Sequence, residues 1–380
     1  MLFRSVPYLV RSIAGAPAGE FFFHKKDLPE DIHERNIVFF EGIDASNPSQ
    51  INGLGSGTSH TSKVVVISPP SAAGADVDYT FYQIGIGEKV ADDKGTCGNL
   101  MAAVGAFAVD EGLVEVDSVN QFAQVTAFNT NIGKMIKLQV PVTGGKARVA
   151  GDYLMPGLVT TGAKYTVDIL TPGGGKTGAT LPLGSRLSMT ADSDTIELSF
   201  VDVVNPFVYV SAASLGLTGT EPNSVLSENK LLLDQLESMR REMAVRSGME
   251  ATLETARLAP AVPKVAIVAE PQDYITSSGQ TIRRDEVDIV AKMVSMGRFH
   301  RTFAGSGLYN LAAAVLLPGT IPNQLTSIEP GCRERIVRIG HPDGVAEVRA
   351  ALVDEGNDVA FVGLERTARR IMKGDLYVPD

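Results

Sequence analysis

Lys63 and Cys97 are the two side chains of this sequence whose types best suit proton transfer. Lys63 directly precedes the apolar run 64–67, which predicts a buried strand. A lysine at that place is either a surface residue that extends its amine into solvent or a partly desolvated amine. Desolvation favours the uncharged amine, and an uncharged amine can act as a base.

Cys97 stands in a glycine-containing loop, directly before an Ala-rich run that suits a helix. The first turn of a helix has unpaired amides and the positive end of the helix dipole, so it can hold a carboxylate or favour a thiolate. The alternative is a small buried thiol without a chemical role.

The segment 97–104 has a second copy at 308–315, where Leu-Tyr-Asn-Leu-Ala-Ala-Ala-Val resembles Cys-Gly-Asn-Leu-Met-Ala-Ala-Val. Such a repeat indicates two similar halves that face each other, with a site between them. The second copy has no thiol, whereas an epimerase that works with two thiols needs one on each face of its carbon. The pattern therefore disfavours epimerisation by two thiols. A proton shift that uses one lysine and one thiol remains possible.

The composition excludes several classes of partner. A net charge of −10 over 380 residues disfavours nucleic acid and anionic membrane, although a small anionic substrate needs only a few local cations. No apolar run approaches the ~20 residues of a membrane span. Two cysteines and five scattered histidines argue against a disulfide framework and a structural metal.

Low cysteine content and the lack of clear targeting signals indicate the cytoplasm. The alternative is a mitochondrial location, because residues 1–19 hold Arg4 and Arg11 and no acid. We prefer to interpret this segment as a first strand, over residues 2–10.

Strand signals dominate, and helices are expected at about 97–111, 224–247, 285–299 and 310–317. Many strands with one or two helices in each half predict an α+β fold. We expect one domain from residues 1–184 plus about 362–380, and a second from residues 185–361.

Motifs along nearly the whole chain resemble the PrpF-type family, which includes 2-methylaconitate isomerase, methylitaconate Δ-isomerase and 4-oxalomesaconate tautomerase. In the first part of the chain, the matching motifs are Asp27-Leu28-Pro29, Gln50-Ile51-Asn52-Gly53-Leu54-Gly55, Thr61-Ser62-Lys63, Asp76-Val77-Asp78-Tyr79 and Cys97-Gly98-Asn99. Downstream, they are Phe128-Asn129-Thr130-Asn131, Val204-Asn205-Pro206, Thr218-Gly219-Thr220-Glu221, Ile339-Gly340-His341-Pro342 and 366–372.

The resemblance implies two diaminopimelate epimerase-like domains, each a strongly curved sheet around a central helix, with the active site in the cleft between them. It implies an isomerase of unsaturated di- or tricarboxylic acids, aconitate-like ones first, which needs no cofactor and no metal. The reaction would be a 1,3-allylic proton shift or a cis/trans interconversion, with Lys63 as the base and Cys97 as an acid, a second base or a pocket wall. Residues expected to bind the substrate are Arg11, Thr61, Ser62, Gly98, Asn99, Asn129, Asn205, His300, Arg301 and Ser306.

Two departures from the family pattern stand out. After an arginine the family reads Gly-Gly-Thr-Ser-Lys-Gly, whereas Arg11 is followed by Ser-Ile-Ala-Gly-Ala-Pro-Ala-Gly. Where the family has a lysine before Leu-Pro-Thr-Gly, this chain has Ala179 before Leu-Pro-Leu-Gly. The altered loop after Arg11 motivates one alternative, a non-catalytic carboxylate-binding helper of an aconitase-type partner enzyme. A second alternative is a decarboxylase of such acids on the same scaffold. A homodimer is compatible with all three functions.

Overall fold

The computed structural model describes residues 3–13, 18–58, 61–94, 96–98, 100–117, 119–155, 160–191, 194–295 and 297–379. The chain forms two compact units, Met1–Leu170 with Glu365–Asp380 and Thr171–Leu364. The expected limits at 184/185 and 361/362, and the expected site between the halves, stay predictions.

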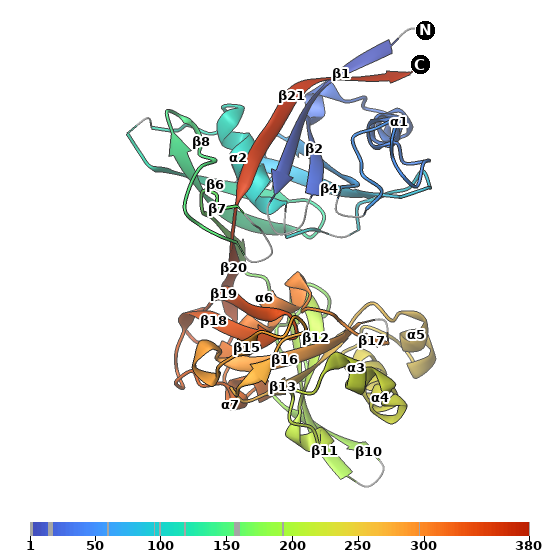
Figure 1. The fold of residues 1–380 in the computed structure, drawn as a ribbon, viewed down its shortest axis with the longest axis vertical. Coiled ribbons are helices and arrows are strands. Elements are labelled where there is room, and N and C mark those ends of the chain that lie inside the picture. Colours follow the sequence, from blue (N-terminus) through green and yellow to red (C-terminus); the bar gives the residue numbers. More distant parts are fainter. Residues whose placement is uncertain are drawn as a thin grey trace. The chain divides into compact units, whose positions relative to one another are not determined.

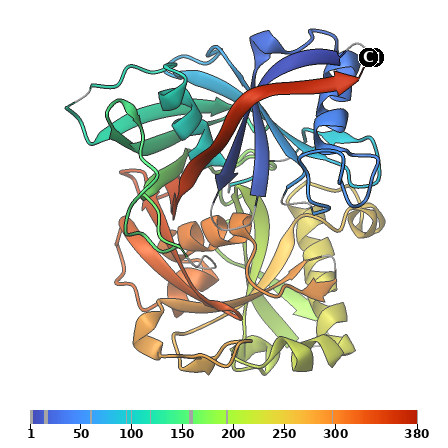
Figure 2. The ribbon, with the colours of Figure 1, turned by 45° about the horizontal axis from the view of Figure 1, so that its top comes forward.

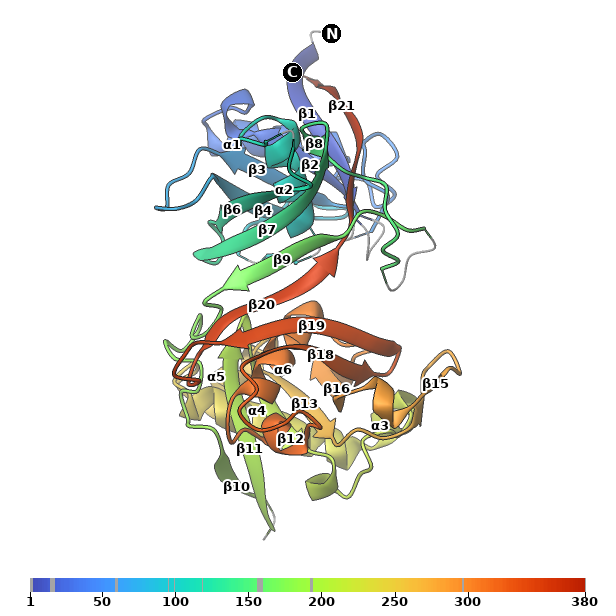
Figure 3. The same cartoon turned by 90° about the vertical axis from the view of Figure 1, so that its left-hand side faces the viewer.

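The first unit is built on a mixed sheet. Its strands are β1 (Phe3–Ile13), β2 (Ala18–His24), β3 (Lys63–Ser68), β4 (Val77–Ile84), β5 (Ala91–Asp92), β6 (Phe122–Asn129), β7 (Lys134–Thr143), β8 (Lys146–Ala147), β9 (Tyr165–Leu170) and β21 (Ala368–Pro379). The two ends of the chain meet here, because β1 pairs antiparallel with β21 along its whole length (Figure 1). Figure 3 shows β4, β6, β7 and β9 side by side.

Helix α2 (Met101–Asp110) is the centre of the first unit, and α1 (Ile32–Ile43) lies between β2 and β3 in sequence. Every residue of α2 from Met101 to Val109 is buried, as expected for a helix that is apolar on all sides. Its approach to β7 requires Gly105, since a Cβ there would lie 2.7 Å from Cγ2 of Val140. A short 3₁₀ turn, Lys25–Asp27, follows β2.

The second unit repeats this plan. Its strands are β10 (Leu187–Ala191), β11 (Asp194–Val203), β12 (Asn205–Ser211), β13 (Lys264–Ala269), β14 (Tyr274–Ile275), β15 (Thr281–Ile282), β16 (Ile289–Ser295), β17 (Arg298–Phe299), β18 (Glu334–His341), β19 (Gly344–Leu352) and β20 (Val359–Arg366). Its helices are α3 (Asn223–Glu228), α4 (Lys230–Arg246), α5 (Leu253–Leu258), α6 (Gly305–Leu316) and α7 (Ile321–Leu325), with 3₁₀ turns at Ala213–Leu215 and Arg284–Glu286. Figure 2 shows α6, in orange, lying across the strands of this unit.

The two units share one order of strand pairing. Along the first unit, from β1 through β2, β3, β4, β6 and β7 to β9, the pairs are antiparallel, parallel, antiparallel, parallel, antiparallel and antiparallel. The same alternation runs in the second unit from β11 through β12, β13, β16, β18 and β19 to β20. The repeat detected in the sequence therefore belongs to a repeat of the whole supersecondary unit.

Three of our helix predictions need correction. Residues 285–299 form a short 3₁₀ turn and strand β16, because a central strand buried on both faces has no polar alternation and resembles a helix in sequence. Helix α2 begins at Met101, four residues later than Cys97, whereas α6 begins at Gly305, before the second motif copy. We also did not predict α1, which Asp31 caps by accepting a hydrogen bond from the amide of Glu34.

No helix among the described residues combines the length and the apolar character that a membrane span requires.

Asn310 ties α6 to its neighbouring strands. Its fully buried side-chain amide donates to the carbonyl oxygens of Val201, Val203 and Asn205, at 2.9, 3.0 and 2.8 Å. The hydroxyl of Tyr209 donates to its Oδ1 at 2.7 Å. The asparagine of the second motif copy is thus a structural residue.

Replacing Asn310 by Leu should lower the free energy of unfolding by about 3 kcal/mol or more, because it leaves buried carbonyl groups without donors. Tyr209→Phe, which removes one hydroxyl from the same cluster, should cost about 1 kcal/mol. Urea unfolding of both variants measures the difference. Equal losses would contradict the central place of Asn310.

Candidate active site

Lys63 and Cys97 touch. The Nζ of Lys63 donates a hydrogen bond to Sγ of Cys97 at 3.2 Å, and only 5% of the Lys63 residue surface is exposed. The thiol is partly exposed and forms no disulfide. An amine and a thiol in contact, one buried and one reachable from solvent, can pass a proton between them and to a bound molecule.

The sheet fixes the position of Lys63. It is the first residue of β3, between Glu20 of β2 and Gln83 of β4. Gln83 donates from Nε2 to the carbonyl oxygen of Ser62 at 2.8 Å. The hydroxyl of Ser62 is fully buried and bonds to the side chain of Gln50, at 2.7 Å from its Nε2. Ser62 therefore supports the position of Lys63, and its predicted contact with the substrate stays a prediction.

Asn129 supports the segment that carries Cys97, the hydrogen-bond partner of Lys63. Its buried Nδ2 donates to the hydroxyls of Tyr79 and Thr96, both at 2.7 Å, so both amide hydrogens are used. Its Oδ1 accepts from the amide of Asn131 at 2.9 Å. Thr96 directly precedes Cys97. Asn129 therefore helps to position the segment before Cys97, and its predicted contact with the substrate stays a prediction.

Cys97 precedes the helix by one turn rather than capping it. Its carbonyl accepts a hydrogen bond from the amide of Leu100 at 3.3 Å, and Leu100 is the residue before α2. Gly98 lies in this turn and is partly exposed, and Asn99 lies outside the described residues. We predicted that backbone amides at Cys97 and the following residues bind a carboxylate of the substrate. This stays a prediction.

The other predicted residues lie in three places. Thr61 is partly exposed, and its hydroxyl accepts from the amide of Ser56 at 3.1 Å. The backbone of Arg11 lies in β1, opposite Glu20 and Arg370. Asn205, His300, Arg301 and Ser306 all belong to the second unit, where Ser306 is the second residue of α6.

The loop that carries Ala179 is anchored by a buried carboxylate. Oδ2 of Asp202 accepts from the amides of Lys176 and Thr177, at 2.8 and 2.7 Å, and from the Thr177 hydroxyl at 2.9 Å. Asp202 is fully buried. The loop therefore keeps a fixed shape without a polar side chain at position 179.

Lys292 and His341, which we did not predict as site residues, have perturbed titration. Burial lowers the pKa of Lys292 to about 8, against an opposing attraction from Glu221. Burial also lowers the pKa of His341 to about 4, with smaller contributions from Asp343, His300 and Lys292. Such shifts concentrate at functional sites. The only sequence feature that could have drawn attention to this region is the position of Lys292 within an apolar strand.

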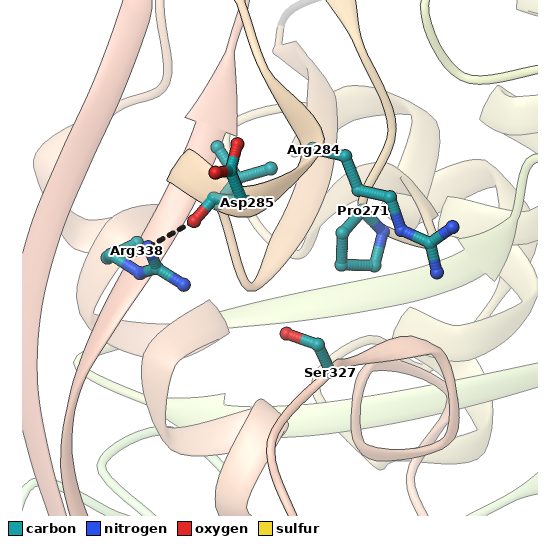
Figure 4. A pocket seen from close by; sticks show the side chains of 6 residues that line it. Pro271, Arg284, Asp285, Ser327 and Arg338 are labelled. Carbon is teal, nitrogen blue, oxygen red and sulfur yellow. Dashed lines mark hydrogen bonds between the residues drawn. The ribbon is translucent and has the colours of Figure 1, made fainter.

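A cavity of about 460 Å³ lies elsewhere in the second unit. Figure 4 shows Arg338 beside the backbone of Asp285 there, with Arg284 and Ser327 on other sides. Arg338 is already paired with the buried carboxylate of Asp288 at 2.8 Å. None of the predicted site residues lines this cavity. Among the described residues, no three His, Cys, Asp or Glu side chains gather closely enough to hold a metal ion.

Comparison with known proteins identifies the family. The PrpF protein family matches residues 9–379. The chain is 40% identical over 368 residues to the 3-methylitaconate isomerase of Eubacterium barkeri, covering 96% of this chain and 95% of that protein. The chain belongs to the PrpF family. The resemblance predicted from its motifs is confirmed.

Two further relatives support this assignment. The 2-methyl-aconitate isomerase of Shewanella oneidensis is 32% identical over 380 residues, covering 96% of this PrpF chain and 95% of the relative. The crystal structure of a methylitaconate-delta-isomerase superposes with a TM-score of 0.92 at 37% identity, covering 99% of this chain and 96% of that one. The protein is accordingly an isomerase of the PrpF family, whose characterised relatives act on unsaturated carboxylic acids.

Replacing Asn129 by Leu should release the loop of Cys97, because it removes both donors that hold Tyr79 and Thr96. We expect amide hydrogen exchange at Thr96, Cys97 and Gly98 to accelerate by about tenfold or more, given ~1–3 kcal/mol for a lost buried hydrogen bond. Asn120→Leu, at an exposed position, is the control. Unchanged protection in Asn129→Leu would contradict the positioning role.

Stability should depend on pH through His341. Because its pKa is about 4 in the folded protein and near 6.5 in the unfolded chain, the unfolded chain binds more protons between these values. The free energy of unfolding should therefore fall as pH is lowered from about 6.5 to about 4.

His341→Asn keeps an acceptor but does not titrate, so denaturant unfolding of this variant should fall less steeply with acidification than that of the native protein. His33→Asn, at an exposed position on α1, should keep the native slope. Identical slopes in all three proteins would show that His341 is not the responsible group.

Proposed function

We propose that this chain catalyses a 1,3-allylic proton shift in an unsaturated di- or tricarboxylic acid. The observation that carries the proposal is the 3.2 Å contact between Nζ of Lys63 and Sγ of Cys97. Family membership supplies the reaction class, and relatives named for methylitaconate and 2-methylaconitate indicate the kind of substrate. Cis/trans interconversion of the same acids can proceed through the same intermediate.

The chemistry follows from the two groups. The uncharged amine of Lys63 removes a proton from the allylic carbon, and the electron pair of that C–H bond moves into the double bond and the conjugated carboxylate. The resulting dienolate takes a proton from the Cys97 thiol at the far carbon. The double bond has then moved by one position, with no atom gained or lost.

The contact between the two residues also resets the site. After one turnover Lys63 is an ammonium and Cys97 is a thiolate. A proton that crosses the 3.2 Å hydrogen bond restores the amine and the thiol without exchange with bulk water. This return path is a reason for the two groups to touch rather than to lie on opposite sides of the substrate.

Proton NMR in deuterated water tests the proposal. The substrates to offer are 3-methylitaconate, 2-methylaconitate, cis- and trans-aconitate and 4-oxalomesaconate. We expect new vinyl or methyl signals, and deuterium at an allylic carbon, for at least one acid. Folded protein that exchanges no proton in any of them, or that only releases carbon dioxide, would contradict the proposal.

Lys63→Met should lower turnover of the accepted substrate by about 10²–10⁴-fold, the usual contribution of a general base. Lys89→Met is the matched control, because Lys89 lies in the same unit, exposed and paired with Glu41 at 3.2 Å. Circular dichroism should show native folding for both. Native turnover in folded Lys63→Met would exclude Lys63 as the base.

A further inference from the structure

Strand β21 leaves one of its two edges open. Among the strands that the structure describes, it pairs only with β1, and no other backbone–backbone hydrogen bond of residues 368–379 is found in the described part of the chain. Figure 2 shows β21, in red, crossing the front of the first unit. Its register with β1 is unbroken from Met372 to Pro379, because the bulge lies before it, at Ile371. A regular open edge is a template for another strand.

The same strand exposes large apolar side chains. Leu376 and Val378 pack against the core of the first unit, whereas the exposed fractions of Tyr377, Ile371 and Met372 are 64%, 51% and 43%. Edge strands that remain single are usually protected by charges along the edge. Three exposed apolar side chains on one open strand instead indicate a contact surface.

Gly374 lies in the regular part of this strand without a reason in the chain's own fold. A Cβ at this position would meet no atom within 4 Å, and Gly374 is not among the glycines with positive φ. A glycine inside a strand costs stability and often marks the close approach of another backbone. Because no other part of the described chain approaches Gly374, a second chain explains it better.

The residues beside Gly374 favour a second copy of this chain as that partner. Two identical antiparallel strands pair about a two-fold axis. With the axis at Gly374, Lys373 of each copy lies opposite Asp375 of the other, and Ile371 comes opposite Tyr377 at the ends of the ladder. An axis one residue earlier places two Lys373 side chains opposite each other, and one residue later two Asp375 side chains. Of these three registers, only the one centred on Gly374 pairs opposite charges.

Both charged side chains can reach a second copy. Asp375 is exposed. Nζ of Lys373 binds Glu111 at 2.5 Å, but 55% of the Lys373 side chain is exposed, and an ammonium has three donors. Arg370 also binds Glu111, at 3.1 Å, so this carboxylate keeps a partner when Lys373 makes a further contact.

We propose that two copies of this chain form a homodimer through antiparallel pairing of their β21 strands about a two-fold axis at Gly374. Main-chain hydrogen bonds between the open edges join the sheets of the two first units. Two ion pairs between Lys373 and Asp375, with the apolar contacts of Ile371 and Tyr377, set the register. The homodimer that the sequence leaves open thereby has a defined interface.

Sedimentation velocity of the full chain over a wide range of concentration tests this interface. The native protein should pass from a mass of 40.3 kDa to twice that mass. Asp375→Lys places like charges opposite Lys373 twice and should raise the dissociation constant of the dimer by about tenfold or more. Asp354→Lys is the matched control, because it changes the net charge equally at an exposed position of the second unit. That variant should dimerise like the native protein.

A cysteine at position 374 tests the register, because a residue on the axis faces its own counterpart. In a chain whose Cys97 and Cys332 are replaced by Ser, Gly374→Cys should form a disulfide between copies on mild oxidation. Arg369→Cys is the control on the same exposed strand: its counterpart lies ten residues along the pair, roughly 30 Å away, and should not cross-link.

A native protein that stays monomeric at every concentration would overturn the proposal. So would a dimer whose dissociation constant is unchanged in Asp375→Lys, because its copies would then meet on another surface. A dimer without a cross-link at position 374, or with equal cross-linking at positions 374 and 369, would overturn the axis at Gly374.

Discussion

The hydrogen bond from Nζ of Lys63 to Sγ of Cys97 is the interaction around which the first unit is organised. It joins the start of a buried strand to a loop before the central helix. Neither end could hold this geometry alone, because a lysine has four rotatable bonds and a loop cysteine has little packing. The strand neighbours of β3 and the hydrogen bonds to Ser62 fix one end, and Asn129 fixes the other through Thr96. Preorganisation of this kind is what proton transfer requires.

The second unit repeats the scaffold of the first with different residues at its central helix. The order of parallel and antiparallel pairs is the same, and a buried helix again occupies the centre. At α6, however, Asn310 and Tyr209 form a structural bond, and no thiol is present in this motif copy. In this unit burial lowers the pKa of Lys292, within strand β16, and of His341, at the end of strand β18. The repeated fold therefore has different residues at corresponding positions of its two copies.

Much of this could be predicted from the sequence, and the misses have physical causes. Lys63 and Cys97 were predictable from residue type and motif, but their contact depends on how distant segments pack. Strand β16 was mistaken for a helix because burial on both faces removes the alternation that identifies strands. Asn129 was predicted as a substrate contact, which stays a prediction; that it also holds Tyr79 and Thr96 could not be predicted, because these contacts depend on how distant segments pack. The burial of Lys292 was not predicted, because a lysine is usually exposed.

A double-mutant cycle tests whether Lys63 and Cys97 act as one unit. Turnover of one accepted substrate would be measured for Lys63→Met, Cys97→Ala and the double variant. When two residues act together, the first substitution already removes most of their joint contribution to turnover. The second substitution then adds little. We expect the double variant to be about as slow as the slower single variant. Losses that multiply would show that the two residues act independently, and would contradict the shared proton path.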